Sequence, residues 1–209
     1  MKFIKVFAIA FLAVLAMSVF QSCKQIQSIS KTLNDIQNLQ FKLDNVNNFQ
    51  LGGIGLSNKK SINDFSMTDG LKLTQMWSSS KLPARFTLNV AAKNPNDGSK
   101  AGSQPSTITL QKLDWRLLID DQPTISGTMN KELRIPGGGE STIIPLEMEL
   151  DLYEFFGKQG YDKIANLAFA IGGVNSSPAR LKLDATPTVK TPIGTYTAPR
   201  ITIVDKQYK

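Results

Sequence analysis

Apolar and polar positions alternate with a period of two along much of the chain. The clearest run covers residues 86–93, where Phe86, Leu88, Val90 and Ala92 are separated by Thr, Asn and Ala. Such alternation is typical of a half-buried β-strand. The same pattern predicts further strands at residues 39–44, 108–110, 113–119, 125–135, 144–150, 181–183 and 196–204.

Short clusters rich in Gly, Pro, Asn and Asp separate these strands. The apolar positions change phase between Leu110 and Leu113, which predicts a bulge near Gln111 and Lys112. Pro145 indicates a strand start or an edge strand, because proline cannot donate a hydrogen bond to a strand ladder. Short strands joined by turns predict an antiparallel β-sandwich. The turns are expected at residues 52–55, 94–98, 120–123, 137–139 and 191–194.

The period changes in the segment of residues 151–171. Its apolar residues recur every three or four positions, which is typical of a helix. Gly157 and Gly160 interrupt the segment, and the two glycines at residues 172–173 supply a C-terminal stop. A second segment, residues 64–80, is ambiguous, so the sandwich is expected to carry one or two helices.

The ambiguous segment contains one candidate helix. Thr68 or Asp69 would cap it, and its apolar positions would be Leu71, Met76 and Trp77. This helix would lie between the first two long predicted strands.

The N-terminus has the layout of a secretory signal. Two lysines among the first five residues precede a run of mostly apolar residues over positions 6–20, and Cys23 follows shortly after it. The run falls short of the ~20 residues that a membrane-spanning helix needs. Residues 20–23 resemble the lipobox of bacterial lipoproteins, although Phe20 and Gln21 replace the usual aliphatic and small residues. In those proteins, signal peptidase cleaves before a cysteine that carries a diacylglycerol.

Cys23, the only cysteine of the chain, is therefore the predicted lipidation site. One cysteine cannot form an internal disulfide, and a free thiol has little other use in an oxidising compartment. The expected partner is a membrane, to which acyl chains such as palmitate would anchor the N-terminus of the protein. The alternative is a secreted protein with an unmodified thiol.

These features divide the chain into three parts. Residues 1–22 are the predicted signal peptide, residues 23–38 a lipidated tether, and residues 39–205 one β-sandwich domain. The tether is polar, but its four isoleucine and leucine residues recur at helix-like spacing. A loose tether is favoured, and a short helix within it is the alternative. Removing the signal leaves 187 residues, enough to bury a sizeable core without disulfides.

Composition excludes several classes of chemistry. The chain has no histidine, which removes Ser-His-Asp and Cys-His catalysis and the commonest transition-metal ligand. With Cys23 lipidated, no thiolate is left for structural zinc, and no cofactor is expected. The net charge of +7 is scattered and accompanies no nucleic-acid-binding motif, so no nucleic acid partner is expected. Basic residues near a membrane would add weak attraction to anionic headgroups, ~1 kcal/mol each.

Three constellations invite a ligand interpretation, and turn chemistry explains each of them better. Asp120 and Asp121 are adjacent, and neighbours on a strand would point to opposite faces, whereas Asp is ordinary in a turn. The polar residues of the stretch 94–99 imitate a calcium loop but lack its acidic ligands and its bidentate Glu. The glycines at residues 137–139 precede a strand and lack the Gly-Lys-Ser/Thr of a phosphate loop. We therefore expect no metal site.

One aromatic cluster is a candidate surface for a ligand or a partner. Phe155, Phe156 and Tyr161 stand close to glycines, and they would form an apolar mouth where the predicted helix meets the sheet. Trp77 and Trp115 are also candidates to line a pocket. Trp115 shares the phase of its apolar strand neighbours, however, and is predicted to belong to the core.

Four motifs occur in an order that one protein family shares. They are the strand that runs into Asn94 and Pro95, the hairpin of residues 113–127, the turn and strand of residues 135–146, and the hairpin of residues 189–199. Together, over residues 83–204, they resemble the type 2 late embryogenesis abundant (LEA) proteins, also called the water-stress and hypersensitive-response (WHy) domain, in a bacterial lipoprotein form. The resemblance implies an immunoglobulin-like or fibronectin-III-like β-sandwich with a helix near its C-terminal end. It supplies no catalytic residues.

Two functions remain open, and a third is disfavoured. The first is a non-enzymatic, lipid-anchored domain that contacts proteins, lipids or partially dried surfaces of the cell envelope, with a stress-protective role implied only by the family. The second is a binding module for an apolar ligand or for a partner's edge strand. A hydrolase that uses carboxylates is disfavoured, because no motif fixes a pair of acids.

The residues after Cys23 bear on location. Lys24 stands where inner-membrane lipoproteins of enterobacteria carry an aspartate, and residues 25–27 hold no acidic cluster of the kind that resembles a surface-export signal. By resemblance to these lipoprotein signals, we expect the protein on the periplasmic face of the outer membrane. The alternative is that these residues are only tether.

Overall fold

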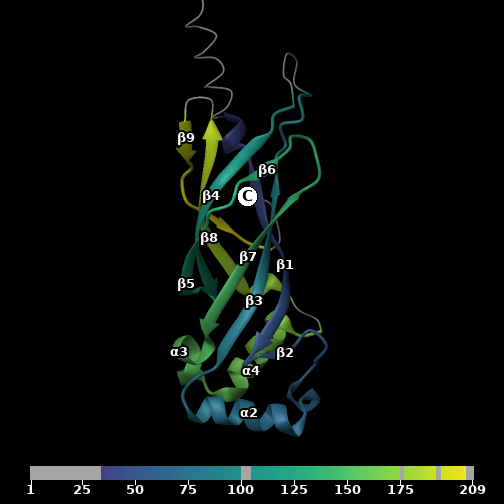
Figure 1. Cartoon of the computed structure of the whole chain (residues 1–209), viewed down its shortest axis with the longest axis vertical. Coiled ribbons are helices and arrows are strands. Elements are labelled where there is room, and N and C mark those ends of the chain that lie inside the picture. Colours follow the sequence, from purple (N-terminus) through teal and green to yellow (C-terminus); the bar gives the residue numbers. More distant parts are fainter. Residues whose placement is uncertain (1–33, 100–104, 175–176, 192–193, 206–209) are drawn as a thin grey trace, which may run out of the picture.

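Two antiparallel sheets pack face to face in an elongated sandwich (Figure 1). The computed structural model describes residues 34–99, 105–174, 177–191 and 194–205 of the chain. The first sheet contains β1 (Gln40–Leu51), β2 (Ile54–Gly55), β3 (Pro83–Lys93) and β7 (Thr142–Asp151). The second sheet contains β4 (Ile108–Ile119), β5 (Gln122–Met129), β6 (Leu133–Ile135), β8 (Leu181–Thr191), β9 (Gly194–Thr197) and β10 (Ile201–Ile203).

The chain forms hairpins within each sheet and passes between the sheets three times, from β3 to β4, from β6 to β7 and from β7 to β8. The first sheet runs β2-β1-β3-β7 and the second β10-β8-β4-β5, while β6 pairs with β4 and β9 pairs with β8. All of these strand pairs are antiparallel. The prediction of a mainly β, antiparallel sandwich is therefore confirmed. Pro145 lies on β7, the last strand of its sheet, where its missing N–H is tolerated.

The alternating apolar residues of both sheets meet in one core. On β3, Phe86, Leu88 and Val90 are at most 4% exposed, and on β4, Leu113 and Leu117 are fully buried. Each apolar Å² removed from water stabilises the fold by roughly 25 cal/mol. The period of two in the sequence thus places one face of each strand in the core.

The predicted bulge and the predicted aspartate turn are both present. The pairing of β4 with β8 shifts its register between Leu110 and Lys112, so residues 108–119 form one bulged strand. Asp120 and Asp121 have φ values of 49° and 66°. These left-handed values suit the two-residue turn that joins β4 to β5.

Four strand predictions were wrong in their extent. The strands expected over residues 39–44 and 181–183 are longer, because β1 runs to Leu51 and β8 to Thr191. The strand expected over residues 125–135 is divided into β5 and β6, which pair with different parts of β4. The strand expected over residues 196–204 is divided into β9 and β10, both paired with β8. The second interruption contains Pro199, which has no N–H for the ladder. Thr191 pairs with Gly194, but the expected turn residues 192–193 lie outside the described residues.

Helices cover one end of the sandwich: α2 (Met67–Ser78), α3 (Leu152–Phe156) and α4 (Tyr161–Gly172) (Figure 1). A 3₁₀ turn, Gly157–Gln159, separates α3 from α4, as the two predicted glycine breaks require. The described residues thus hold more helices than the one or two expected.

The ambiguous segment is helical, but its predicted cap was wrong. Ser66 is the N-cap of α2, and its Oγ accepts a hydrogen bond from the Asp69 amide at 3.1 Å. The Asp69 carboxylate accepts in return from the Ser66 amide at 3.4 Å, which completes a capping box. Leu73 is the residue of α2 that enters the core, at 1% exposed, whereas Leu71 is 67% exposed.

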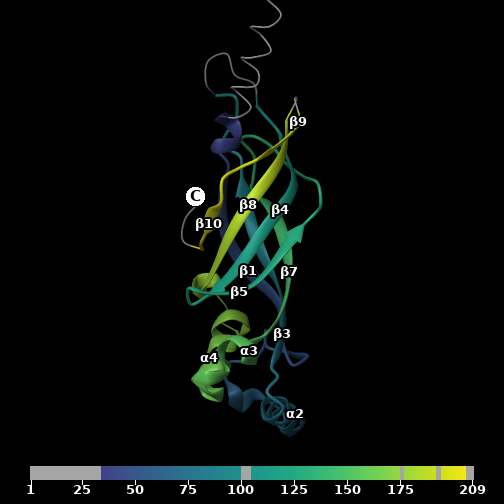
Figure 2. The ribbon, with the colours of Figure 1, turned by 90° about the vertical axis from the view of Figure 1, so that its left-hand side faces the viewer.

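The described chain enters the sandwich at the end opposite α2 (Figures 1 and 2). Residues 34–37 form a helical turn there. Ile36 is 5% exposed and belongs to the core, so the last part of the predicted tether packs against the domain. Cys23 lies outside the described residues. Within the described ranges, no helix is long and apolar enough to cross a bilayer.

Candidate functional site

The three aromatic residues predicted as a binding surface pack the helical end. Phe156 is 1% exposed and lies in the core, and Phe155 is half-buried against it. The Tyr161 ring meets Trp77 edge-on at a centroid distance of 5.4 Å, and Trp77 meets Tyr153 at 4.9 Å. Burial and the neighbouring Asp162 charge raise the pKa of Tyr161. These rings serve mutual packing between helices, and Phe156 has no surface to offer a ligand.

The adjacent aspartates of the β4–β5 turn are held in ion pairs. The two carboxylate oxygens of Asp120 accept hydrogen bonds from one edge of the Arg180 guanidinium, from Nε at 2.7 Å and from Nη2. These bonds raise the pKa of Arg180. Asp121 pairs with Lys182 at the start of β8. The turn is therefore fastened to β8, and both carboxylates have cationic partners.

The stretch that imitates a calcium loop is a structural clamp. Asn94 is 1% exposed, and its Nδ2 donates to the carbonyl oxygens of Ser106 at 2.8 Å and Ile135 at 3.1 Å. Asn96 Nδ2 donates to the Asp35 carbonyl at 2.9 Å. These amides bind three other chain segments to residues 94–96, at the end of the sandwich where residue 34 enters. Within the described part of the chain, no group of three His, Cys, Asp or Glu side chains could hold a metal.

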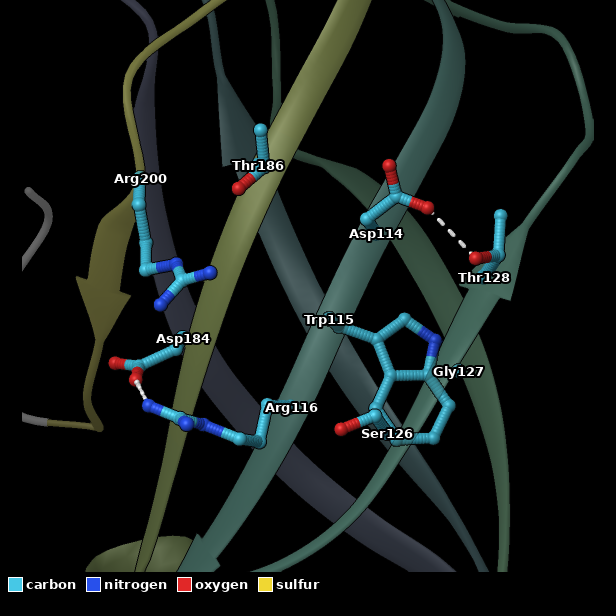
Figure 3. A pocket seen from close by; sticks show the side chains of 9 residues that line it. All are labelled: Asp114, Trp115, Arg116, Ser126, Gly127, Thr128, Asp184, Thr186 and Arg200. Atoms are coloured by element: carbon cyan, nitrogen blue, oxygen red, sulfur yellow. Dashed lines mark hydrogen bonds and ion pairs between the residues drawn. The ribbon is translucent and has the colours of Figure 1, made fainter.

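A polar pocket of about 460 Å³ lies on the second sheet (Figure 3). Arg116 of β4 donates to Asp184 of β8 at 2.8 Å, and Thr202 donates to the same carboxylate at 2.8 Å. Arg200 lies on the same side of the sheet, next to Asp184 (Figure 3). The full lining is Asp114, Trp115, Arg116, Ser126, Gly127, Thr128, Asp184, Thr186 and Arg200.

The carboxylates of this pocket are fixed in their charged form. Hydrogen bonds from Arg116 and then Thr202 lower the pKa of Asp184. Bonds from Lys112 and then Thr128 lower the pKa of Asp114; the two distances are 2.7 Å and 2.6 Å. A general acid or base works best with a pKa near the operating pH. The pKa of each aspartate is moved away from that range, so both act as ion-pair partners, Asp184 with Arg116 across the β4–β8 pair and Asp114 with Lys112 within β4.

An apolar cavity of about 300 Å³ lies at the seam between the two sheets. Its floor consists of buried residues at the start of β1 and the end of β8, and its walls of half-buried residues around β9 and β10. Gln37 and Pro199 are exposed and mark its rim. The floor residues are Ile36, Leu39, Phe41, Pro187 and Val189, and the wall residues are Tyr196, Ala198 and Ile201.

Local backbone contacts explain why the seam is open here. The Leu43 amide donates to the Val204 carbonyl at 2.9 Å and joins the two sheets below the cavity. Above this bond, the interruption between β9 and β10 leaves the edge of the second sheet short. The Ala198 amide donates to the Pro187 carbonyl at 2.8 Å, which holds the interrupted segment as one wall. Because its lining comes from segments far apart in the sequence, residue periodicity gave no signal for this cavity.

Comparisons with known proteins are sparse. No protein-family model matches the chain, and no curated protein matches it. A crystal structure of a protein from Archaeoglobus fulgidus aligns with a TM-score of 0.34 and 10% identity, covering 61% of this chain and 82% of that chain. The solution structure of a protein provisionally described as late embryogenesis abundant (LEA) aligns with a TM-score of 0.35 and 13% identity, covering 90% of this chain and 86% of that chain. Likenesses this weak assign neither a family nor a function.

Proposed function

We propose that this chain is a non-enzymatic β-sandwich module of the LEA type 2 kind that a lipid on Cys23 anchors to a membrane of the cell envelope. The expected place is the periplasmic face of the outer membrane, as Lys24 and the residues after it suggest. A stress-protective role rests on the sequence resemblance over residues 83–204 alone.

The observation that carries the proposal is the fixed point at which the chain enters the domain. Ile36 is buried and the Asp35 carbonyl is bonded to Asn96, so the entry point is held at one end of an elongated sandwich. Cys23 stands eleven residues before Asn34. An extended chain spans at most ~3.6 Å per residue, so this end would stay within roughly 40 Å of the bilayer. The helical end with α2 would face away from the membrane.

The electrostatics of the polar pocket support a role without catalysis. Its two carboxylates have lowered pKa values and are bonded to cations. The chain offers no histidine to act as a general base at neutral pH. The second sheet presents a set of ion pairs to solvent. Such a surface suits contact with other surfaces better than it suits bond cleavage.

Membrane fractionation of Cys23→Ser tests the proposal. Two or three acyl chains hold a protein stably on a bilayer, so wild type should sediment with membranes. The variant should be released as soluble protein or accumulate with its signal uncleaved. Ser28→Ala, five residues further on, is the control and should fractionate like wild type. Normal processing and normal membrane recovery of Cys23→Ser would refute the proposal.

A further inference from the structure

We propose that the apolar cavity at the sheet seam is a binding site for a single acyl chain of a membrane lipid. The cavity lies between the start of β1 and the β8–β10 edge, and its floor is made only of aliphatic, aromatic and proline side chains. The chemistry of the site is independent of Cys23. Only the source of the acyl chain, a nearby bilayer, rests on the proposed function.

The size and lining of the cavity select a narrow, apolar ligand. Its volume of about 300 Å³ is at the lower limit of small-molecule sites. A water-sized group occupies about 30 Å³, so the cavity has room for roughly ten methylene groups. None of the lining residues is charged, and the polar side chains among them are Gln37 at the rim and Tyr196 in the wall. An unbranched hydrocarbon chain fits these limits better than a polar metabolite.

The graded exposure of the lining gives the site a direction. Leu39 and Phe41 are at most 7% exposed and close the inner end, while Gln37 and Pro199 are exposed at the outer end. An acyl chain would therefore enter the cavity with its methyl end first and leave its polar head group at the rim. Burying each methylene would raise the affinity about fourfold until the cavity is full.

The position of the cavity identifies the bilayer as the source. Ile36, which forms part of the floor, lies thirteen residues after Cys23. The rim residue Gln37 belongs to the same helical turn. The tether that we propose thus joins the lipid anchor to the edge of the cavity itself. The site would be held near the membrane surface, where acyl chains are concentrated.

Titration calorimetry with straight-chain fatty acids of six to sixteen carbons, below their micellar concentrations, tests the site. The full chain with Cys23→Ser is used, because no acyl group can then be attached to it. Affinity should rise about fourfold per methylene up to roughly ten carbons and then level off. Absence of binding, or an affinity that keeps rising through sixteen carbons, would overturn the proposal.

Variants of the wall locate the binding. Ala198→Phe should fill the cavity and weaken decanoate binding at least tenfold, whereas Thr195→Phe, an exposed position on β9 outside the lining, should bind as before. If Ala198→Phe does not fold, Val189→Ala replaces it. This variant enlarges the floor, and the plateau should move about two carbons higher. A plateau that stays in place, or equal binding by both phenylalanine variants, would place the ligand elsewhere and overturn the proposal.

Vesicles of phosphatidylethanolamine and phosphatidylglycerol test whether the bound acyl chain comes from the bilayer. After incubation and re-isolation, native mass spectrometry of the Cys23→Ser protein should detect one phospholipid per chain, and Ala198→Phe in the same background should carry none. If decanoate binds Cys23→Ser but not lipidated wild-type protein, the anchor's own acyl chain occupies the cavity. That result would refute the claim that the acyl chain comes from the bilayer, and it would support the lipid anchor on Cys23. An unlipidated wild-type protein that still binds decanoate would refute the proposed function alone.

Discussion

The indole of Trp115 on β4 lies directly against Gly127 on β5. The two residues are paired across the antiparallel ladder, and a Cβ atom on residue 127 would come within 2.3 Å of the ring. Trp115 is half-buried and packs against the core. The indole therefore needs a residue without a side chain at position 127. Together the two residues close the core beneath the short edge strand β5.

Removing either member of this pair should destabilise the domain. Trp115→Ala should cost somewhat less than the ~3–5 kcal/mol of a fully buried aromatic, which lowers the melting temperature by several degrees. Gly127→Ala should cost ~1–3 kcal/mol by overpacking. Thermal unfolding by circular dichroism measures both. A Trp115→Ala protein that melts within a degree or two of wild type would show that the indole contributes little to the core.

Asn94 should be the polar residue on which stability depends most clearly. Its Nδ2 bonds two carbonyl groups, those of Ser106 and Ile135. Asn94→Ala would remove both bonds, and a polar group that loses its partner when buried costs ~1–3 kcal/mol. Urea unfolding should show this loss, while Asn130→Ala, at an exposed position, should stay within ~0.5 kcal/mol of wild type. Equal stability of the two variants would mean that the clamp is dispensable.

Two leucines of α2 should behave in opposite ways. Leu73→Ala should cost ~2–5 kcal/mol, because its side chain is 1% exposed and its removal leaves a cavity. Leu71→Ala, two residues earlier and 67% exposed, should stay within ~0.5 kcal/mol of wild type. Chemical denaturation of both variants measures these changes in the free energy of unfolding. A larger loss for Leu71→Ala would mean that α2 is rotated about its axis.

The ion pair of Arg116 and Asp184 should make stability depend on pH in the acid range. The pKa of Asp184 is held below its ordinary value of 3.8, mainly by the bond from Arg116. A carboxyl whose pKa is lower in the folded state stabilises the fold above its unfolded pKa, and that contribution disappears as pH falls through the folded pKa. Asp184→Asn should therefore flatten the fall in stability below about pH 4. Urea titrations between neutral pH and about pH 2.5 test this, and an unchanged slope would contradict it.

Patterns along single segments were enough to predict most of the strands and the sandwich class. The alternation at Phe86, Leu88 and Val90 is a local signal, because one face of a strand must be apolar. The register shift after Leu110 was predictable for the same reason. The α2 cap was missed because Ser66, Thr68 and Asp69 all suit an N-terminus, and their neighbours alone do not decide between them.

Features that depend on distant contacts could not be predicted in this way. Helical spacing places Phe156 on an apolar face, but whether that face is open or covered depends on what packs over it. The division into β9 and β10, by contrast, had a local signal in Pro199, which the alternation of the strand prediction did not take into account. The seam cavity combines residues near Phe41 with residues near Ile201, and no local period records that proximity.

The mass of the mature protein purified from its own membranes tests the central claim most directly. The account predicts a chain that lacks residues 1–22 and begins at Cys23, with a mass increase on the N-terminal peptide equal to a diacylglycerol. Fragmentation should place that increase on the Cys23 sulfur. An intact N-terminus, or a chain that begins at an unmodified Cys23, would contradict it.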